Sequence, residues 1–252
     1  PGDLSSYANA VKLMQSFDVI HKLSPAPEPQ DIPVHLRHYE MIQIQLGYGD
    51  KAITVCGWGR QQVTECFELM QTGLDLSNPK FAFGPYRSKL INTNSLNLSD
   101  RPMAQVVIDF SRTGRMCIVT PFCLAGAMAP ITVARALALQ HAKALATITL
   151  NQLAAPGAPV TYGSFGSNVD LKSGAPAFGT PEHIQMLIRS GRLARHIGLP
   201  WRSAAGGASN TNDIQAPHEK EMSVWGCLRA NATLLIHSAG WLEGGLTFGF
   251  EK

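Results

Sequence analysis

The stretch that decides the fold is Thr233-Leu-Leu-Ile-His-Ser-Ala-Gly-Trp-Leu-Glu-Gly-Gly245. Apolar residues bring His237 to the end of an expected strand, and two glycine-rich turns follow with Trp241 and Glu243 between them. Strands that end in small-residue turns bearing polar and aromatic side chains are typical of the pocket-forming edge of a β/α barrel. The same arrangement recurs at 162–164 and 203–207. We therefore expect a functional site where these strand ends meet.

Strand-like and helix-like segments alternate along the whole chain. The expected strands are 18–23, 52–56, 89–93, 116–120, 159–164, 199–203 and 232–237. An amphipathic helix is expected before them, over 7–20, and a helical pattern follows each strand except the last. This alternation predicts a parallel sheet, and no G-x-G-x-x-G turn indicates a doubly wound dinucleotide fold. We predict an α/β protein with a (β/α)₈ TIM barrel that is incomplete here, with about seven βα units. Residues 1–252 would form a single domain, truncated at both ends, and the chain stops where an eighth unit should begin.

Two helices carry local boundary signals. Thr180, Pro181 and Glu182 form an N-cap, a first-position proline and a first-turn acid, so a helix should start there and run to Ile197. A second helix is expected over 31–46, with Pro33 in its first turn. Gly47 would then be its stop.

Composition limits the possible partners. Apolar residues make up 45% of the chain and charged residues 15%, with a net charge of +3 and no long basic run. This argues against nucleic acid or an anionic membrane as partner. The longest apolar runs contain Arg135, His141 and Lys143, so we expect no transmembrane helix. Cys56 and Cys117 fit small buried hydrophobic positions, and we expect a cytoplasmic protein, with a homo-oligomer left open.

Metal and hydrolase sites are disfavoured. The sequence has no H-E-x-x-H motif or clustered Cys/His spacing, and His35, His38 and Glu40 are expected on a solvated helix face. Ser164 lies in a Gly-Ser-Phe-Gly stretch that is not a G-x-S-x-G elbow. We expect neither a bound metal nor a directly bound cofactor.

Four longer motifs resemble the trimethylamine methyltransferase family. They are IVTPFCLAGAM at 118–128, PGAPVTYGS at 156–164, KSGAP with GTPE at 172–182, and HSAGWLEGG at 237–245. The resemblance runs from about residue 18 to residue 252. It implies a TIM-barrel methyltransferase that passes a methyl group from a methylated amine to the Co(I) of a separate corrinoid protein docked over the barrel mouth. The corrinoid would thus be supplied by the partner.

One departure from the family narrows the substrate. The founding trimethylamine enzymes carry pyrrolysine near the segment that matches 203–213, and this sequence has only ordinary residues there. The resemblance therefore implies the pyrrolysine-free branch, whose members look like quaternary-amine demethylases acting on betaine-type substrates. We expect a methylated amine of the betaine type, quaternary or tertiary, as substrate.

The chemistry of such a substrate selects candidates at the expected strand ends. A quaternary ammonium has a fixed charge and no N–H donor, so aromatic faces would hold it by cation–π attraction. A carboxylate needs cationic or hydrogen-bond-donating side chains. The cage candidates are Phe122, Tyr162, Phe165 and Trp241, and the carboxylate candidates are Ser164, Arg202, Ser203 and His237. His237 is also a catalytic candidate, together with Glu243 placed near the cation.

Several of these residues have a structural alternative. Tyr162 faces either the barrel interior or the helix layer, and the period-2 pattern does not decide between them. Glu243 could be the first-turn acid of a following helix. Asn168 and Asp170 lie in a polar loop, where they would either face the corrinoid partner or form Asx turns.

Two other functions fit the same pattern. One is a barrel that captures a betaine without transferring its methyl group. The other is a TIM-barrel enzyme with a phosphate-bearing substrate, in which the Gly206-Gly207 backbone binds the anion.

Overall fold

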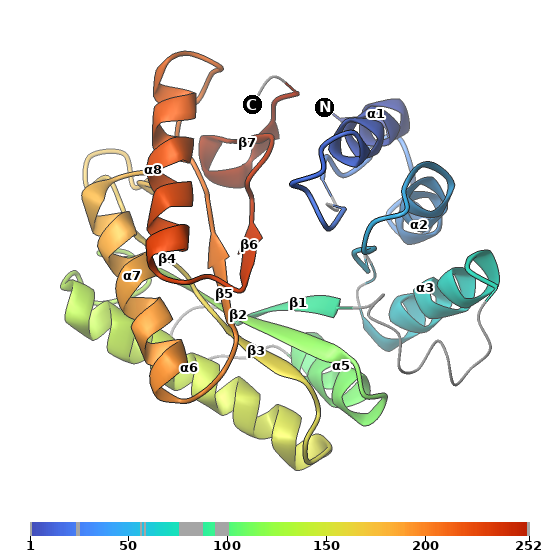
Figure 1. The fold of residues 1–252 in the computed structure, drawn as a ribbon, viewed down its shortest axis with the longest axis horizontal. Coiled ribbons are helices and arrows are strands. Elements are labelled where there is room, and N and C mark those ends of the chain that lie inside the picture. The colour runs from blue at the N-terminus through green and yellow to red at the C-terminus, as the bar shows by residue number, and fades with distance from the viewer. Residues whose placement is uncertain are drawn as a thin grey trace.

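The computed structural model describes residues 2–23, 26–55, 57, 59–75, 88–93 and 101–250. Within these ranges, helices and parallel strands alternate along most of the chain (Figure 1). The helices are α1 (Leu4–Gln15), α2 (Arg37–Tyr48), α3 (Gly59–Gly73), α5 (Arg101–Arg112), α6 (Val133–Ala154), α7 (Pro181–His196) and α8 (Gln215–Arg229). The strands are β1 (Ser88–Thr93), β2 (Met116–Ala125), β3 (Val160–Gly163), β4 (Phe165–Asn168), β5 (Trp201–Ala204), β6 (Leu234–Ile236), β7 (Trp241–Leu242) and β8 (Thr247–Phe248).

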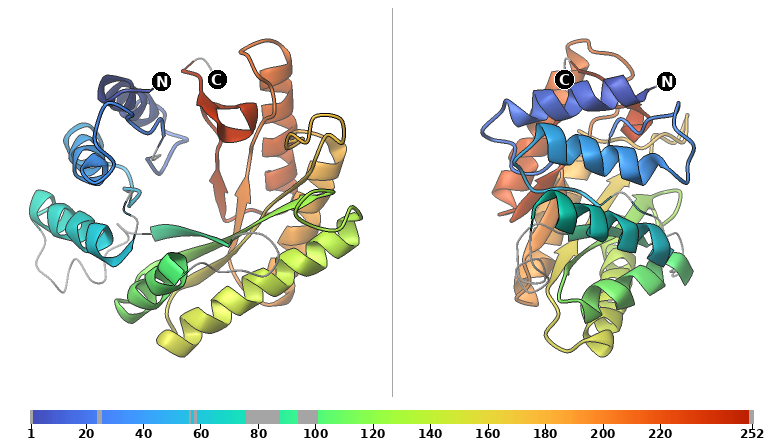
Figure 2. Two further views of the ribbon diagram at one scale, coloured as in Figure 1. Left: turned by 180° about the vertical axis from the view of Figure 1, so that it is seen from behind. Right: turned by 90° about the vertical axis from the view of Figure 1, so that its right-hand side faces the viewer.

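The main sheet is parallel, and its strands lie side by side in chain order, β1-β2-β3-β5-β6. β4 continues β3 along β2, because Val119 pairs with Tyr162 and Phe122 pairs with Phe165 at the same offset. A parallel bridge between Lys22 and Ala52 marks two further strand positions. The helices lie outside the curled sheet (Figures 1 and 2). The described residues therefore form a parallel half-barrel that is compatible with a partial TIM barrel.

The core lies between the sheet and this helix layer. Cys117 belongs to a buried cluster with residues of α3 and α5, while Tyr162 and Trp201 pack against α6, α7 and α8. The burial of Cys117 confirms its prediction, whereas Cys56 lies outside the described residues. None of the described helices combines the length and apolar character that a membrane crossing requires.

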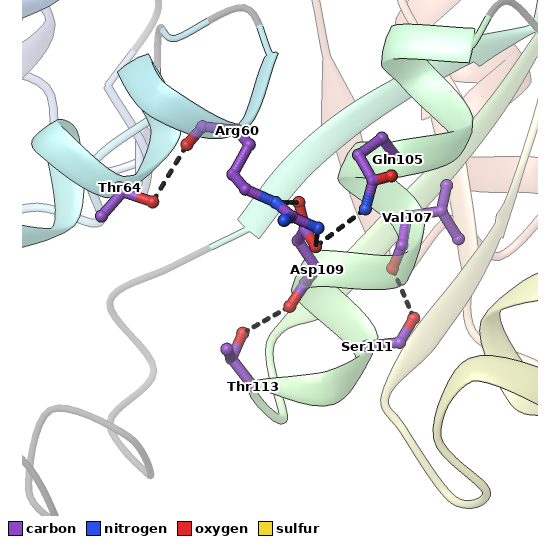
Figure 3. Close-up of polar contacts among 7 residues, drawn as sticks. All are labelled: Arg60, Thr64, Gln105, Val107, Asp109, Ser111 and Thr113. Carbon is purple, nitrogen blue, oxygen red and sulfur yellow. Dashed lines mark hydrogen bonds and ion pairs between the residues drawn. The ribbon is translucent and has the colours of Figure 1, made fainter.

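Polar contacts on the outer surface connect the neighbouring helices α3 and α5. Arg60 of α3 donates from Nε and Nη2 to the two carboxylate oxygens of Asp109 on α5, at 2.9 and 2.8 Å (Figure 3). Gln105 adds a hydrogen bond to the same carboxylate. A hollow of about 240 Å³ lies beside this pair, with Val63 and Phe67 among its lining residues.

The N-terminus of α7 confirms the sequence prediction, while the helix expected over 31–46 needs correction. The Thr180 hydroxyl accepts a hydrogen bond from His183 N, and Pro181 opens α7. α2, however, starts only at Arg37 and runs through Gly47. Gly47 is not among the glycines with positive φ, so it does not adopt the left-handed conformation of a helix-ending glycine. The helix ends instead at Gly49, whose backbone is extended and whose N–H donates to the carbonyl of Gln45.

Three further expectations differ from the structure. The first helix starts at Leu4, capped by the Asp3 carboxylate, so it lies earlier than expected. The polar loop expected at Asn168 begins later, because β4 extends the preceding strand along β2. At the other end of the chain, residues 241–248 form the antiparallel hairpin β7–β8, so the helix that Glu243 could have opened is not formed there. Phe248 of this hairpin packs against the cluster formed by α1 and α2.

Candidate active site

Five aromatic side chains meet at the carboxyl ends of the strands. Phe165 lies at their centre, with its ring centroid 5.0 Å from that of Phe122 and 5.1 Å from that of His237. Its ring is stacked on Phe178 at 5.2 Å and meets the ring of Trp241 edge-on at 5.7 Å. We call Phe122, Phe165, Phe178, His237 and Trp241 the aromatic group.

The strand register explains why these residues meet. Val119 and Tyr162 pair on the helix side of the sheet, so Phe122 and Phe165, three residues further along each strand, face the opposite side. Arg202 shares this inner side, because its neighbour Trp201 packs into the helix layer. Side chains from β2, β4, β5 and the loop after β6 thereby converge at one edge.

The members of the aromatic group differ in how deeply they are buried. Phe178 is buried, with 1% of its surface exposed, but Phe122, Phe165, His237 and Trp241 are each only half-buried. These four residues therefore keep part of their surface exposed next to one another, and a cation–π contact would require an exposed ring face among them.

Arg202 is the most unusual residue of the site. It is completely buried, its Nη1 donates to the Ser164 carbonyl at 2.8 Å, and its Cζ lies 5.5 Å from the Phe165 ring centre. Its Nε and Nη2 have no acceptor among the described residues. Burial lowers the pKa of Arg202 to about 9, so the guanidinium still carries its charge at neutral pH. A buried cation with unmet N–H groups is costly, and an anion seated beside it would remove that cost.

His237 and Trp241 present further polar atoms beside the rings. His237 Nδ1 and Trp241 Nε1 are buried without a hydrogen-bond partner in the described part of the chain, and the two rings lie 3.9 Å apart. Burial, followed by the charges of Arg202 and Lys220, holds the pKa of His237 well below its usual value. His237 is thus neutral at physiological pH, and its backbone is left-handed, with φ of 63°.

The hairpin that contains Trp241 has two glycines at positions with no room for a side chain. At Gly240, with φ of 71°, a Cβ atom would lie 2.1 Å from the Phe248 ring. At Gly245, with φ of 103°, it would lie 2.4 Å from Trp241 Cζ2. The backbone therefore packs directly against the rings at both turns.

Two predicted site residues do not join the aromatic group. Tyr162 is buried on the helix side, where its hydroxyl is hydrogen-bonded to His141 Nδ1 at 3.0 Å. It therefore faces the helix layer, the alternative left open above. Ser203 faces the same layer and accepts a hydrogen bond from Cys227 Sγ on α8. Ser164 is buried beside Arg202, which its carbonyl contacts, while its hydroxyl has no partner in the described residues.

The remaining candidates lie at the end of β4 and in turns that follow strands. Asn168 Oδ1 accepts from the Thr180 hydroxyl at 2.9 Å. Asp170 caps a turn, and the hydrogen bond from the Ser173 hydroxyl lowers its pKa. Glu243 lies in the short 3₁₀ turn η1 (Glu243–Gly245) of the hairpin, so it does not open an α-helix. These placements leave the proposed contacts of the three side chains with a substrate or partner as predictions.

Sequence reasoning missed Phe178 and Glu219. Phe178 comes from the Gly- and Pro-rich loop after β4, where no periodic pattern marks a side chain as inward-facing. Glu219 of α8 accepts from Ala208 N at 2.7 Å and Ser209 N at 2.9 Å. These amides follow Gly206-Gly207, so the chain's own carboxylate already binds the loop that was a candidate phosphate site, which weakens that alternative.

Metal-ligating side chains are not grouped in the described ranges, where no three His, Cys, Asp or Glu residues could share an ion. The expectation of a solvated helix face fails at His38. This residue is 2% exposed, and its Nε2 lies 2.7 Å from Glu65 Oε2. It is buried on the side of α2 that contacts α3, the helix that carries Glu65.

Comparison with known proteins shows the family of this chain. The family model described as trimethylamine methyltransferase (MTTB) matches residues 1–252. The chain is 31% identical over 254 aligned residues to the glycine betaine methyltransferase of Desulfitobacterium hafniense (strain Y51), covering 99% of this chain and 52% of that protein. It is 38% identical over 165 residues to the trimethylamine methyltransferase MttB1 of Methanosarcina mazei, covering 65% of this chain and 33% of that protein. The chain thus spans about half the length of the first of these relatives. It belongs to the trimethylamine methyltransferase family.

Proposed function

We propose that this chain binds a quaternary methylated amine that also carries a carboxylate, and that it takes part in transferring a methyl group from this amine to the Co(I) of a separate corrinoid protein. The observation that carries the proposal is Arg202, a buried guanidinium whose Nε and Nη2 have no acceptor among the described residues and whose Cζ lies 5.5 Å from the ring centre of Phe165. A betaine-type zwitterion places a cation and an anion a few bonds apart. The aromatic group and Arg202 offer complementary partners at a similar spacing.

Each end of the substrate would meet a different part of the site. Phe122, Phe165 and Trp241 would hold the quaternary ammonium, each ring contributing roughly 0.5–2 kcal/mol. Arg202 Nε and Nη2 would donate to the carboxylate, in a charge-assisted pair stronger than neutral hydrogen bonds. Trimethylamine has no carboxylate and would leave Arg202 unpaired. The site therefore favours the betaine class, as the name of one relative also does.

Methyl transfer from such a substrate needs positioning more than proton chemistry. The methyl–nitrogen bond breaks with its electron pair staying on nitrogen, so the leaving group is a neutral amine and no acid or base is required. The corrinoid of the partner would supply the Co(I) that accepts the methyl group. The residues of this chain would orient the methyl group toward the open edge and keep water from the ammonium. His237, neutral and packed on Trp241, would fix that ring rather than move a proton.

Exposed apolar side chains around the site fit a docking partner. Ile131, Leu171, Ile214 and Leu246 lie in loops that follow four different strand segments, and each is between 65% and 89% exposed. Leu171 and Ile131 flank Gly126, at 3.5 and 3.9 Å from the position of a Cβ atom there. Such residues, close to the site and open to solvent, are common where a partner binds.

A calorimetric screen tests the substrate class. Glycine betaine, proline betaine and carnitine should bind, and trimethylamine should bind at least about tenfold more weakly for lack of the carboxylate. Inorganic phosphate should not bind. Tighter binding of phosphate than of any betaine would contradict the proposal.

Methyl transfer is tested separately, with a Co(I) corrinoid protein and a binding amine. Methylation of the corrinoid, followed by absorbance, should appear, and its absence would leave a betaine-binding protein. Leu171→Ser should raise the KM for the corrinoid protein several-fold without changing amine affinity. Leu153→Ser, on an equally exposed residue near the far end of α6, is the matched control and should change neither.

A further inference from the structure

Three residues on one side of α8 contact the loops that surround the aromatic group. Glu219 Oε2 accepts from Ala208 N, Ser209 N and the Ser209 hydroxyl at 2.7, 2.9 and 2.9 Å. Although burial alone would raise it, the pKa of Glu219 lies below its usual value because of hydrogen bonds that include those from Gln215 and Ser209. The carboxylate is therefore ionised at neutral pH and holds the loop after β5.

The loop after β4 packs onto the same side chain. Gly179 has φ of 86°, and a Cβ atom there would lie 2.5 Å from Glu219 Cβ. Phe178, the buried member of the aromatic group, is the residue just before it. Glu219 thus contacts two of the loops that supply the site.

Lys220 and Ser223 fasten the strand ends themselves. Lys220 Nζ donates to the carbonyls of Ala205 and His237, which follow β5 and β6. The Ser223 hydroxyl donates to the Gly206 carbonyl at 2.9 Å. His237 needs such support because a non-glycine residue in the left-handed region is strained.

Backbone hydrogen bonds connect the loop after β5 to the hairpin that contains Trp241. Glu243 N donates to Ser209 O at 2.9 Å, and Gly244 N donates to Gly207 O at 3.3 Å. A Cβ atom at Gly206 would lie 3.4 Å from Trp241 Nε1. The loop that Glu219 holds is therefore the surface on which the Trp241 hairpin rests.

We propose that Glu219 and Lys220 are positioning residues for the amine site, a role that rests on the proposed function. They set the distance between the Trp241 hairpin and Phe165 without touching the substrate. A site held in this way binds its ligand with little rearrangement, because its supporting contacts are made beforehand.

Glu219→Gln tests this role, because the amide keeps the size of the side chain and removes the charge. We expect the Kd for glycine betaine to rise about tenfold with unchanged calorimetric stoichiometry. Hydrogen exchange of residues 241–246 should become faster, although Glu219 makes no hydrogen bond to this segment among the described contacts. Lys220→Met should act in the same direction through His237.

Two controls separate positioning from simple loss of folding. Gln215→Ala removes a hydrogen bond to Oε1 of Glu219 but leaves the bonds from Ala208 N and Ser209 N to Oε2 in place, and should change neither measurement. Ser209→Ala should give a smaller change than Glu219→Gln, and serves if the latter folds poorly. A fall in stoichiometry with unchanged Kd, or unchanged exchange of 241–246, would overturn the positioning role. If the unmodified chain binds no betaine, the proposed function fails, and the exchange experiment alone decides the role of Glu219 and Lys220.

Discussion

Two arginines of this chain lie in opposite environments, one at the contact between α3 and α5 and the other beside the aromatic group. Arg60 is exposed, and it is matched by both oxygens of Asp109 (Figure 3). Arg202 is fully buried, and two of its N–H groups have no partner in the described structure. A folded chain gains little from an exposed pair and loses much from an unmatched buried cation. The second arrangement is therefore better explained by ligand binding than by stability.

Replacing Arg202 should give the largest effect. In Arg202→Met the affinity for glycine betaine should fall about 100-fold, because charge-assisted hydrogen bonds to the carboxylate are lost. The free energy of unfolding should stay the same or rise, because an unpaired buried charge is removed. Calorimetry and urea unfolding measure the two quantities.

Trimethylamine is the matched ligand control for Arg202→Met, and its affinity should not fall. A variant that loses stability but keeps betaine affinity would make Arg202 a structural residue. The comparison with Arg60 would then lose its meaning.

The buried histidine beside the site should make the protein sensitive to acid. Burial, followed by the charge of Lys220, lowers the pKa of His183 to about 3, against about 6.5 in an unfolded chain. Below pH 6.5 this histidine binds a proton in the unfolded state but not in the folded state, so the free energy of unfolding decreases as the pH is lowered. The loss should reach about 2 kcal/mol at pH 5.

Urea unfolding at pH 7 and pH 5 checks this loss. His183→Gln should reduce the difference between the two pH values by about 2 kcal/mol. Equal pH dependence in the unmodified chain and His183→Gln would contradict the expected role of burial.

Removing the Trp241 ring should weaken quaternary-amine binding by about 1–2 kcal/mol, the size of a partly desolvated cation–π contact. Calorimetry with glycine betaine measures the change, and Trp241→Phe should retain much of the affinity. Trp225→Ala is the control, since this ring is 57% exposed on α8. An unchanged affinity in Trp241→Ala would place the cation elsewhere.

The smallest effect is expected for Arg60, the exposed arginine at the contact between α3 and α5. Arg60→Ala should lower the free energy of unfolding by less than about 1 kcal/mol, because the pair is solvated. Amine binding should not change. A marked loss of binding would show that the contact between α3 and α5 reaches the site, and would break the contrast with Arg202.

The alternation of elements was readable from the sequence, but the faces of the strands were not. Apolar runs such as 116–120 marked strands, and Thr180-Pro181 marked a helix start, because these signals are local. Tyr162 could not be assigned to a side, since both faces of a barrel strand are buried and the period-2 pattern is silent there. Only the pairing of Tyr162 with Val119 and Trp201 settles it.

The site residues that lie at strand ends could be predicted from the sequence. Phe122, Phe165, Arg202, His237 and Trp241 do come together, because parallel strands in chain order bring their carboxyl ends to one edge. Phe178 and Glu219 were missed because a loop and the next helix place them. Their positions depend on tertiary contacts such as Gly179 against Glu219, which leave no periodic trace in the sequence.

The glycines of the Trp241 hairpin have a consequence for redesign. Gly240 and Gly245 press their backbones against Phe248 and Trp241 in conformations that disfavour any side chain. Random mutagenesis across this turn would mostly yield proteins with a displaced tryptophan, whatever amine is selected for. Libraries meant to change substrate preference should vary Phe122 and the residues around Arg202, and leave the turn intact.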